Sequence, residues 1–220
     1  MAYTLHTEPY VDQLAHWPKS GQHIMAQYDD DTVVVYQAYN QRIGHYAAAE
    51  DCFYGAPGFK MECMTWIKPN FLWMMHRSEW ASRENQTVVL AIWLDRVGFD
   101  AMLRKAIPSS YDERVFETYE DWQQAVGSSS VRVQWDPDYN PSDGRLDRWA
   151  VQIGIRGKTA RHYADGGWIY HIEDITEFVL EQHANRRKPY RDLLLPRERV
   201  YPVYDEDVAF RLGVDELSGK

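Results

Sequence analysis

Residues 64–80 read MTWIKPNFLWMMHRSEW, and this stretch determines how the rest of the chain is interpreted. Its tryptophans, Trp66, Trp73 and Trp80, follow one another at intervals of seven residues, which places them near one stripe of a helix. Most of the remaining side chains are apolar, so we expect the segment to lie at the centre of the fold. Its polar side chains need partners there, because an unpaired buried polar group costs roughly 1–3 kcal/mol.

The helix within this stretch is predicted to run from Pro69 to about Ser78. Proline suits the first helical turn, and the residue before a proline is disfavoured in the α region, so residues 66–68 are predicted to be extended. Lys68 and Asn70 then lie at a helix N-terminus, where free N–H groups and the macrodipole favour an anion. Two interpretations follow: a phosphate site, or a buried amphipathic helix from which the Lys68 ammonium reaches the surface.

The composition describes an acidic, aromatic-rich globular protein. A chain of 220 residues is expected to form one domain. Nine tryptophans and fifteen tyrosines predict a large core together with a surface on which rings can stack. The net charge of −9 argues against binding nucleic acid by general electrostatics.

The two cysteines, Cys52 and Cys63, have no metal-site or redox spacing and are predicted to be free thiols in the cytoplasm. We find no secretory pattern at the N-terminus and no apolar run of about eighteen residues, so neither secretion nor membrane spanning is expected. The spacing of the histidines does not predict a metal site.

The predicted elements indicate an α+β fold with a mainly antiparallel, split sheet packed with helices. Strands and helices do not alternate regularly, which disfavours a doubly wound parallel sheet. The expected organisation is a loop-rich segment over residues 1–31, a core over 32–185 and an irregular C-terminal arm over 186–220. Strands are predicted over 32–38, 87–94, 131–135, 148–156 and 168–173, and helices over 40–48, 69–78, 99–107, 112–125 and 176–185, with a turn over 157–167.

Four segments of the chain resemble one known family. They read WIKPNFLWMM at 66–75, YQAYN at 36–40, VQWDP at 133–137 and QIGIRG at 152–157. Together they closely resemble the domain of unknown function 4291 family over residues 32–180. The resemblance is specific for the family and implies no activity, because the family name carries none. The common hydrolase, NTPase and dehydrogenase signatures are not present.

The predicted order of elements is also similar to the ADP-ribosyltransferase fold. That resemblance implies an early strand whose Arg or His grips NAD and a late strand that carries a catalytic Glu. Gln37 stands where the Arg or His is expected, and Gln152 stands near the position of the Glu. A glutamine can hydrogen-bond ribose, but it lacks the charge that stabilises the transition state. The Ser-Thr-Ser segment of that fold is not visible.

The working hypothesis is a nucleotide pocket that uses NAD or a related phosphorylated nucleotide, with an unknown acceptor and with Gln37 and Gln152 as candidate catalytic residues. Lys68 and Arg77 are expected to meet phosphates, and Trp66 or Trp73 to stack on a base. The other candidate ligand-binding residues are Tyr39, Asn40, Asn70 and Arg156.

Two alternatives remain. Gln152 and Arg156 also fit a solvated sheet face. From another class, a non-catalytic module for RNA or protein would use the aromatic surface and the basic cluster Arg186-Arg-Lys188, although the overall acidic charge counts against RNA.

Overall fold

The computed structural model describes residues 3–216. Three antiparallel strands form one sheet in the order β10 (Ile169–Asp174), β6 (Val88–Asp95) and β4 (Thr32–Tyr39). The sequences TVVVYQAY and VVLAIWLD are rich in β-branched and apolar residues, and both strands are buried along most of their length. Such runs are typical of strands covered on both faces.

A second sheet has the order β2 (Ser20–Gln22), β9 (Arg145–Ile155), β8 (Val131–Tyr139) and β7 (Ala106–Pro108). The short strand β5 (Thr65–Ile67) also pairs with β9. The central pairings of β9 with β8 and β5 are antiparallel, while β2 and β7 join in parallel at the edges. The predicted α+β class with mainly antiparallel sheets is therefore confirmed.

The two sheets are joined at a single backbone bridge between Tyr36 and Lys68. The Tyr36 N–H donates to the Lys68 carbonyl at 2.7 Å, and the Lys68 N–H donates to the Tyr36 carbonyl at 3.1 Å. Strands β4 and β5 consequently lie side by side, and the central strands follow one another in the order β6, β4, β5, β9 and β8.

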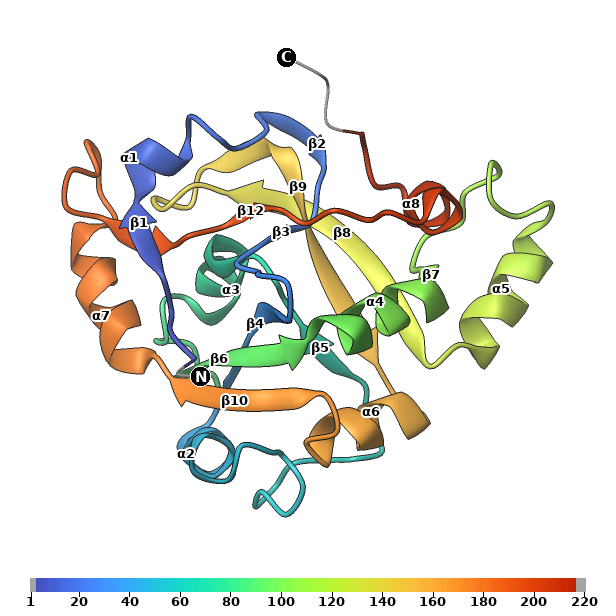
Figure 1. Cartoon of the computed structure of the whole chain (residues 1–220), viewed down its shortest axis with the longest axis horizontal. Coiled ribbons are helices and arrows are strands. Elements are labelled where there is room, and N and C mark those ends of the chain that lie inside the picture. The colour runs from blue at the N-terminus through green and yellow to red at the C-terminus, as the bar shows by residue number, and fades with distance from the viewer. Residues whose placement is uncertain (1–2, 217–220) are drawn as a thin grey trace.

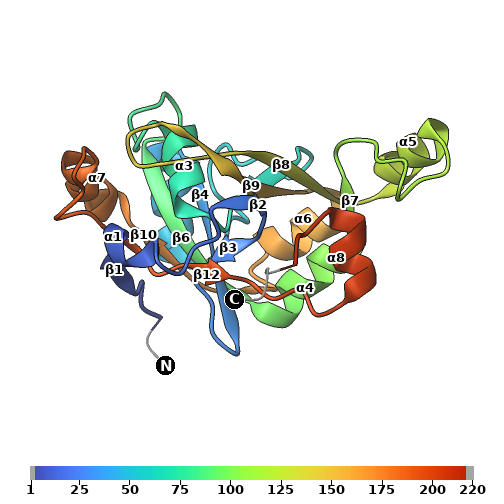
Figure 2. The ribbon, with the colours of Figure 1, turned by 90° about the horizontal axis from the view of Figure 1, so that it is seen from above.

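Two apolar clusters cover opposite faces of this joined sheet. Val35, Ile67 and Ile153 belong to the first, which we call the main core. Tyr36 belongs to the second, which lies beneath α3 (Phe71–Ser78) and which we call the α3 core. Figure 2 shows α3 well apart from the group formed by α4, α6 and α8, and Figures 1 and 2 both show α5 projecting from the body. The remaining helices are α1 (Tyr10–Gln13), α2 (Gln41–Glu50), α4 (Arg96–Lys105), α5 (Tyr119–Ser128), α6 (Gly157–Ala164), α7 (Thr176–Asn185) and α8 (Glu206–Leu212).

Several helix boundaries differ from the predicted ones. Helix α3 begins at Phe71 rather than Pro69, because the Asn70 side chain caps it. Helix α5 begins at Tyr119 rather than at Asp112, since Thr118 caps it, and it ends at Ser128 rather than at Ala125. The turn predicted over 157–167 contains α6.

The C-terminal segment is more ordered than the irregular arm that we expected. Strand β11 (Leu194–Pro196) pairs with β1 (Thr7–Pro9), and β12 (Arg199–Val200) pairs with β3 (Met25–Ala26). These short strands were missed because each depends on a partner more than a hundred residues away. The two ends of the chain thus support each other beside the sheets (Figure 1).

Glu198 connects this C-terminal segment to α3. Its side chain is almost fully buried. The carboxylate accepts a hydrogen bond from the Phe71 N–H at 2.6 Å and another from the Asn70 amide at 3.1 Å. Burial raises the pKa of this carboxyl well above its usual range, while the Phe71 N–H and Asn70 oppose the shift. An internal acidic group therefore occupies the N-terminus of α3.

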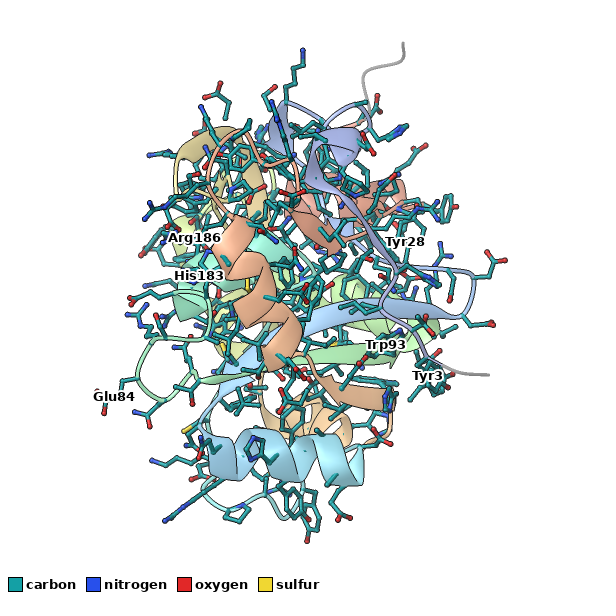
Figure 3. All side chains as sticks on the ribbon, turned by 90° about the vertical axis from the view of Figure 1, so that its left-hand side faces the viewer. Tyr3, Tyr28, Glu84, Trp93, His183 and Arg186 are labelled. Carbon is teal, nitrogen blue, oxygen red and sulfur yellow. The ribbon has the colours of Figure 1, made fainter. Side chains whose placement is uncertain are left out.

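Replacing Glu198 with alanine is expected to lower the free energy of unfolding by about 2–4 kcal/mol, because two buried donors lose their acceptor. Urea unfolding followed by tryptophan fluorescence measures this change. Glu84→Ala is the matched control, since Glu84 is exposed and points away from the body (Figure 3). Equal stability of the two variants would contradict the structural role of Glu198.

Candidate functional site

Six side chains form a polar and aromatic surface on the α3 side of the joined sheet. The pairing registers place Trp66 opposite Gly154 on β9, and Gln134 opposite Gln152. Directly paired residues point to the same face, and alternate residues along a strand share that face. These registers, the bridge at Lys68 and the charge of Arg77 acting on Lys68 define what we call the Lys68 surface, made of Trp66, Lys68, Arg77, Gln134, Asp136 and Gln152.

Lys68 is the least ordinary member of this surface. The residue is only 6% exposed. Its ammonium donates to the Trp66 carbonyl at 3.3 Å and lies 5.9 Å from the centre of the Trp73 ring. Burial and, to a smaller extent, the positive charge of Arg77 lower the pKa of Lys68 to about 7, while the carboxylate of Asp136 opposes the shift. The amine therefore changes its charge near neutral pH, as functional lysines often do.

Arg77 supplies the second cation from the last turn of α3. Stacking of His76 on Tyr139, with ring centres 3.5 Å apart, holds this part of α3 against β8. The guanidinium is half-buried, and within residues 3–216 it forms no ion pair. Two cations thus lie close enough for one to shift the pKa of the other.

Asp136 contributes the negative charge of the surface. Its two carboxylate oxygens accept from the Gln134 amide at 2.9 Å and from the Gln152 amide at 2.7 Å. This contact orients both glutamine side chains. Asp136 was not among the predicted site residues because the strand predicted over 131–135 ends before it, whereas β8 continues through it to Tyr139.

Of the two candidate stacking residues, Trp66 is the more accessible. It is partly exposed and packs on the backbone of Gly154, where an added Cβ would lie 2.9 Å from its ring. Trp73 is only 7% exposed, and its indole nitrogen has no hydrogen-bond partner within the described residues. Stacking on a ligand is therefore better suited to Trp66.

The structure does not bring Gln37 and Gln152 together. The Gln37 amide donates to the Thr65 hydroxyl at 2.8 Å and to the Trp66 carbonyl at 3.1 Å, and its oxygen accepts from the Tyr163 hydroxyl at 2.6 Å. Tyr163 belongs to the main core, on the other face of the sheet from Gln152. The Gln37 side chain thus links β4 to β5 and to α6 through these hydrogen bonds.

Tyr39 and Asn40 also have internal partners. The Tyr39 ring packs on Phe53 and its hydroxyl bonds Gln37 at 3.0 Å, and burial raises its pKa to about 12. The Asn40 side chain caps α2 by accepting from the Ile43 N–H at 3.2 Å. Both residues lie where β4 ends and α2 begins, and neither belongs to the Lys68 surface.

Asn70 and Arg156 are likewise committed to the fold. Asn70 caps α3 and donates to Glu198. The Arg156 guanidinium donates to the carbonyls of Val126, Gly127 and Ser129 at the C-terminal end of α5. The Glu198 carboxyl group occupies the start of α3, so a ligand phosphate could bind only along the flank of the helix.

The four sequence segments point to a single family. The family model described as "Domain of unknown function (DUF4291)" matches residues 23–201. The chain therefore belongs to this family, as the sequence resemblance predicted. No curated protein matches the chain significantly.

Within residues 3–216, no helix has both the length and the apolar composition needed to cross a membrane. Over the same residues, no three His, Cys, Asp or Glu side chains come together as a group that would hold a metal ion.

Replacing Lys68 with methionine is expected to raise the free energy of unfolding at pH 7. The pKa of Lys68 is about 7 in the folded protein and 10.5 in its ordinary state, so the unfolded chain binds more protons between these values. The free energy of unfolding of the wild type therefore increases as the pH rises from about 7 to 10.5, by up to about 1.4 kcal/mol per pH unit. The ammonium of Lys68 therefore destabilises the folded wild type most strongly below pH 7.

Urea unfolding at pH 7, 8 and 9 tests this expectation, with the advantage of K68M over wild type shrinking at each step. Lys158→Met removes an exposed lysine and serves as the control. A constant difference between K68M and wild type across the three pH values would show that Lys68 has an ordinary pKa.

Proposed function

We propose that the Lys68 surface binds the phosphates of a nucleotide, with NAD as the first candidate and ADP-ribosyl transfer as the reaction. The observation that carries this proposal is the pair Lys68 and Arg77, two neighbouring cations without an ion-pair partner in residues 3–216. Guanidinium and ammonium groups are the side chains that most often bind phosphate. Trp66 beside them offers a ring for a base or nicotinamide.

Asp136 and Gln152 suit the sugar chemistry of this reaction. In ADP-ribosyl transfer the bond between ribose C1′ and nicotinamide breaks, and its electron pair leaves with nicotinamide. The acceptor nucleophile then bonds C1′ and releases a proton. Positive charge develops on the ribose in between, and a carboxylate stabilises it. Gln152 lacks that charge, but Asp136 lies 2.7 Å from it and supplies a carboxylate. We assign hydroxyl binding to Gln152 and charge stabilisation to Asp136.

The strand order gives further support to an ADP-ribosyltransferase-like arrangement. Strand β4, which resembles the first unit of that fold, and β9, which carries Gln152, lie on either side of β5. The early and late strands are thus separated by one strand only. Gln37 has no place in this proposal, because it lies on the other face of the sheet.

The rival hypothesis is a non-catalytic module that binds RNA or protein through the basic cluster at residues 186–188. Within that cluster Arg186 is paired with Asp143 at 2.9 Å, which reduces its availability to a partner. We favour the nucleotide hypothesis, because Trp66, Asp136 and Gln152 lie on the same surface as its two cations.

Calorimetric titration with NAD, ADP-ribose, ATP and a short RNA tests the binding step. We expect a nucleotide to bind more weakly as the pH rises above 7, by up to about tenfold per unit, because phosphate favours protonated Lys68. Binding at pH 8 should accordingly take up a proton, which titrations in buffers of different ionisation enthalpy measure. K68M should abolish binding, while Lys158→Met should leave it unchanged. If none of the three nucleotides binds, the proposed function is wrong.

Asp136→Asn separates binding from catalysis. The amide keeps an oxygen acceptor at nearly the same position but carries no charge, so NAD should still bind while release of labelled nicotinamide falls by roughly a hundredfold or more. Asp147→Asn is the control, since Asp147 is an exposed carboxylate at another position of the same sheet. Unchanged turnover in D136N would remove Asp136 from the mechanism.

A further inference from the structure

A cavity of about 490 Å³ lies at the opposite end of β4 from the Lys68 surface. Its wall is formed by the N-terminal segment, the turn between β3 and β4, the junction of β6 and α4, and Tyr170 of β10. Figure 3 shows Tyr3, Tyr28 and Trp93 on the same side of the molecule, away from His183 on α7 and from Arg186, which follows α7. The volume is in the usual range for small-ligand sites.

Carboxylates dominate the charged groups of this cavity. Four aspartates line it, at positions 29, 30, 31 and 95, against two arginines. Asp29 and Asp95 already have backbone partners. The Asp29 carboxylate accepts from N–H groups of the turn before β4, and the Asp95 carboxylate caps α4. Asp30 and Asp31 are exposed, and within residues 3–216 their side chains form no ion pair or hydrogen bond. Two carboxylates therefore remain available to a ligand.

One of the two arginines is already occupied. The Arg96 guanidinium donates to the Asp29 carbonyl at 2.8 Å and to the Tyr201 hydroxyl at 3.3 Å, and it lies 5.4 Å from the centre of the Tyr28 ring. Arg197 is exposed at the rim. The negative charge at Asp30 and Asp31 is thus not neutralised by Arg96.

Gln27 provides an independent indication of what the cavity accepts. The residue is 7% exposed and lines the cavity. Its amide nitrogen donates to the Thr4 carbonyl at 3.1 Å, but its amide oxygen has no hydrogen-bond partner among the described residues. A buried acceptor without a donor is costly. A ligand that places an N–H group beside the Gln27 oxygen would remove this cost.

Aromatic rings complete the wall. Tyr3 stacks on Tyr170 with ring centres 6.1 Å apart and lies 6.4 Å from Trp93. Tyr170 and Tyr3 are both well exposed. Aromatic faces attract cations, most strongly when the cation is also shielded from water.

We propose that this cavity binds a cationic group, either an alkylammonium or a guanidinium. Asp30 and Asp31 bind its charge, the Gln27 oxygen accepts one of its N–H groups, and the rings of Trp93 and Tyr170 pack on its carbon chain. The cation is carried by a free amine or by a Lys or Arg side chain of a peptide. This site is independent of the Lys68 surface, so its failure would leave the nucleotide proposal intact.

Calorimetric titration of the full chain with agmatine, spermidine and N-acetyl-arginine amide tests the proposal, with N-acetyl-glutamate amide as the anionic probe. We expect at least one cationic probe to bind saturably and the anionic probe not to bind. Binding only of agmatine or spermidine would identify a free amine as the ligand, and binding only of the capped arginine would identify a peptide side chain.

The double variant D30N/D31N should weaken binding by roughly tenfold or more, because it removes both charges without changing side-chain shape. The double variant D12N/D147N removes the same charge from exposed positions elsewhere and should bind like wild type. Tyr170→Ala provides a second test, since it removes an exposed ring and should also weaken binding. The proposal is overturned if no cationic probe binds, or if D30N/D31N and D12N/D147N bind equally well.

Discussion

The backbone bridge between Tyr36 and Lys68 is the contact on which the rest of the structure depends. It is the point at which two sheets become one continuous surface. It also fixes the backbone of a lysine between two strands at the centre of the molecule. Because side chains alternate along a strand, Lys68 must point to the face opposite the main core, beneath α3. The lowered pKa of this lysine is therefore a consequence of how the sheets are joined.

The start of α3 shows how the fold excludes one otherwise attractive site. A helix N-terminus attracts an acidic group. In this protein the Glu198 carboxyl group occupies that position, from the segment that also pairs β11 with β1 and β12 with β3. The N-terminus of α3 therefore already has an acidic partner from the protein itself. Any phosphate bound nearby would depend on side chains along the flank of α3, above all Lys68 and Arg77.

Local sequence pattern predicted the elements that are long and apolar. The strands at 32–38 and 87–94 and the helix at 176–185 agree closely with β4, β6 and α7, since each has a continuous pattern of its own. Helix α6 begins with Gly157 and has few strong apolar positions, and it was assigned to a turn. Its stability depends on Tyr163 and Ala164 packing in the main core, which no local pattern reveals.

Only part of the candidate site could be predicted, because local sequence pattern does not reveal contacts between distant segments. Trp66, Lys68 and Arg77 belong to one stretch, so their proximity followed from local structure. The face on which Gln37 lies depends on the register at the bridge to β5, and a shift of one residue would have turned it toward Gln152. Asp136 joined the surface only because β8 extends further than its apolar residues indicate.

The distribution of charge explains how a chain with a net charge of −9 can retain free cations. Most ion pairs of the described residues lie away from the Lys68 surface, and the buried pair of Arg148 with Asp138 uses a carboxylate of β8 that follows Asp136 by two positions. The strand register shifts between Pro137 and Tyr139, and the buried Asp138 carboxylate is held by Arg148, whose guanidinium lies over the Trp17 ring. This second carboxylate of β8 is therefore paired with Arg148. With Asp30 and Asp31 held at the other end of β4, the strand separates an acidic cavity from a basic surface, and the local charges rather than the net charge decide which ligands each one attracts.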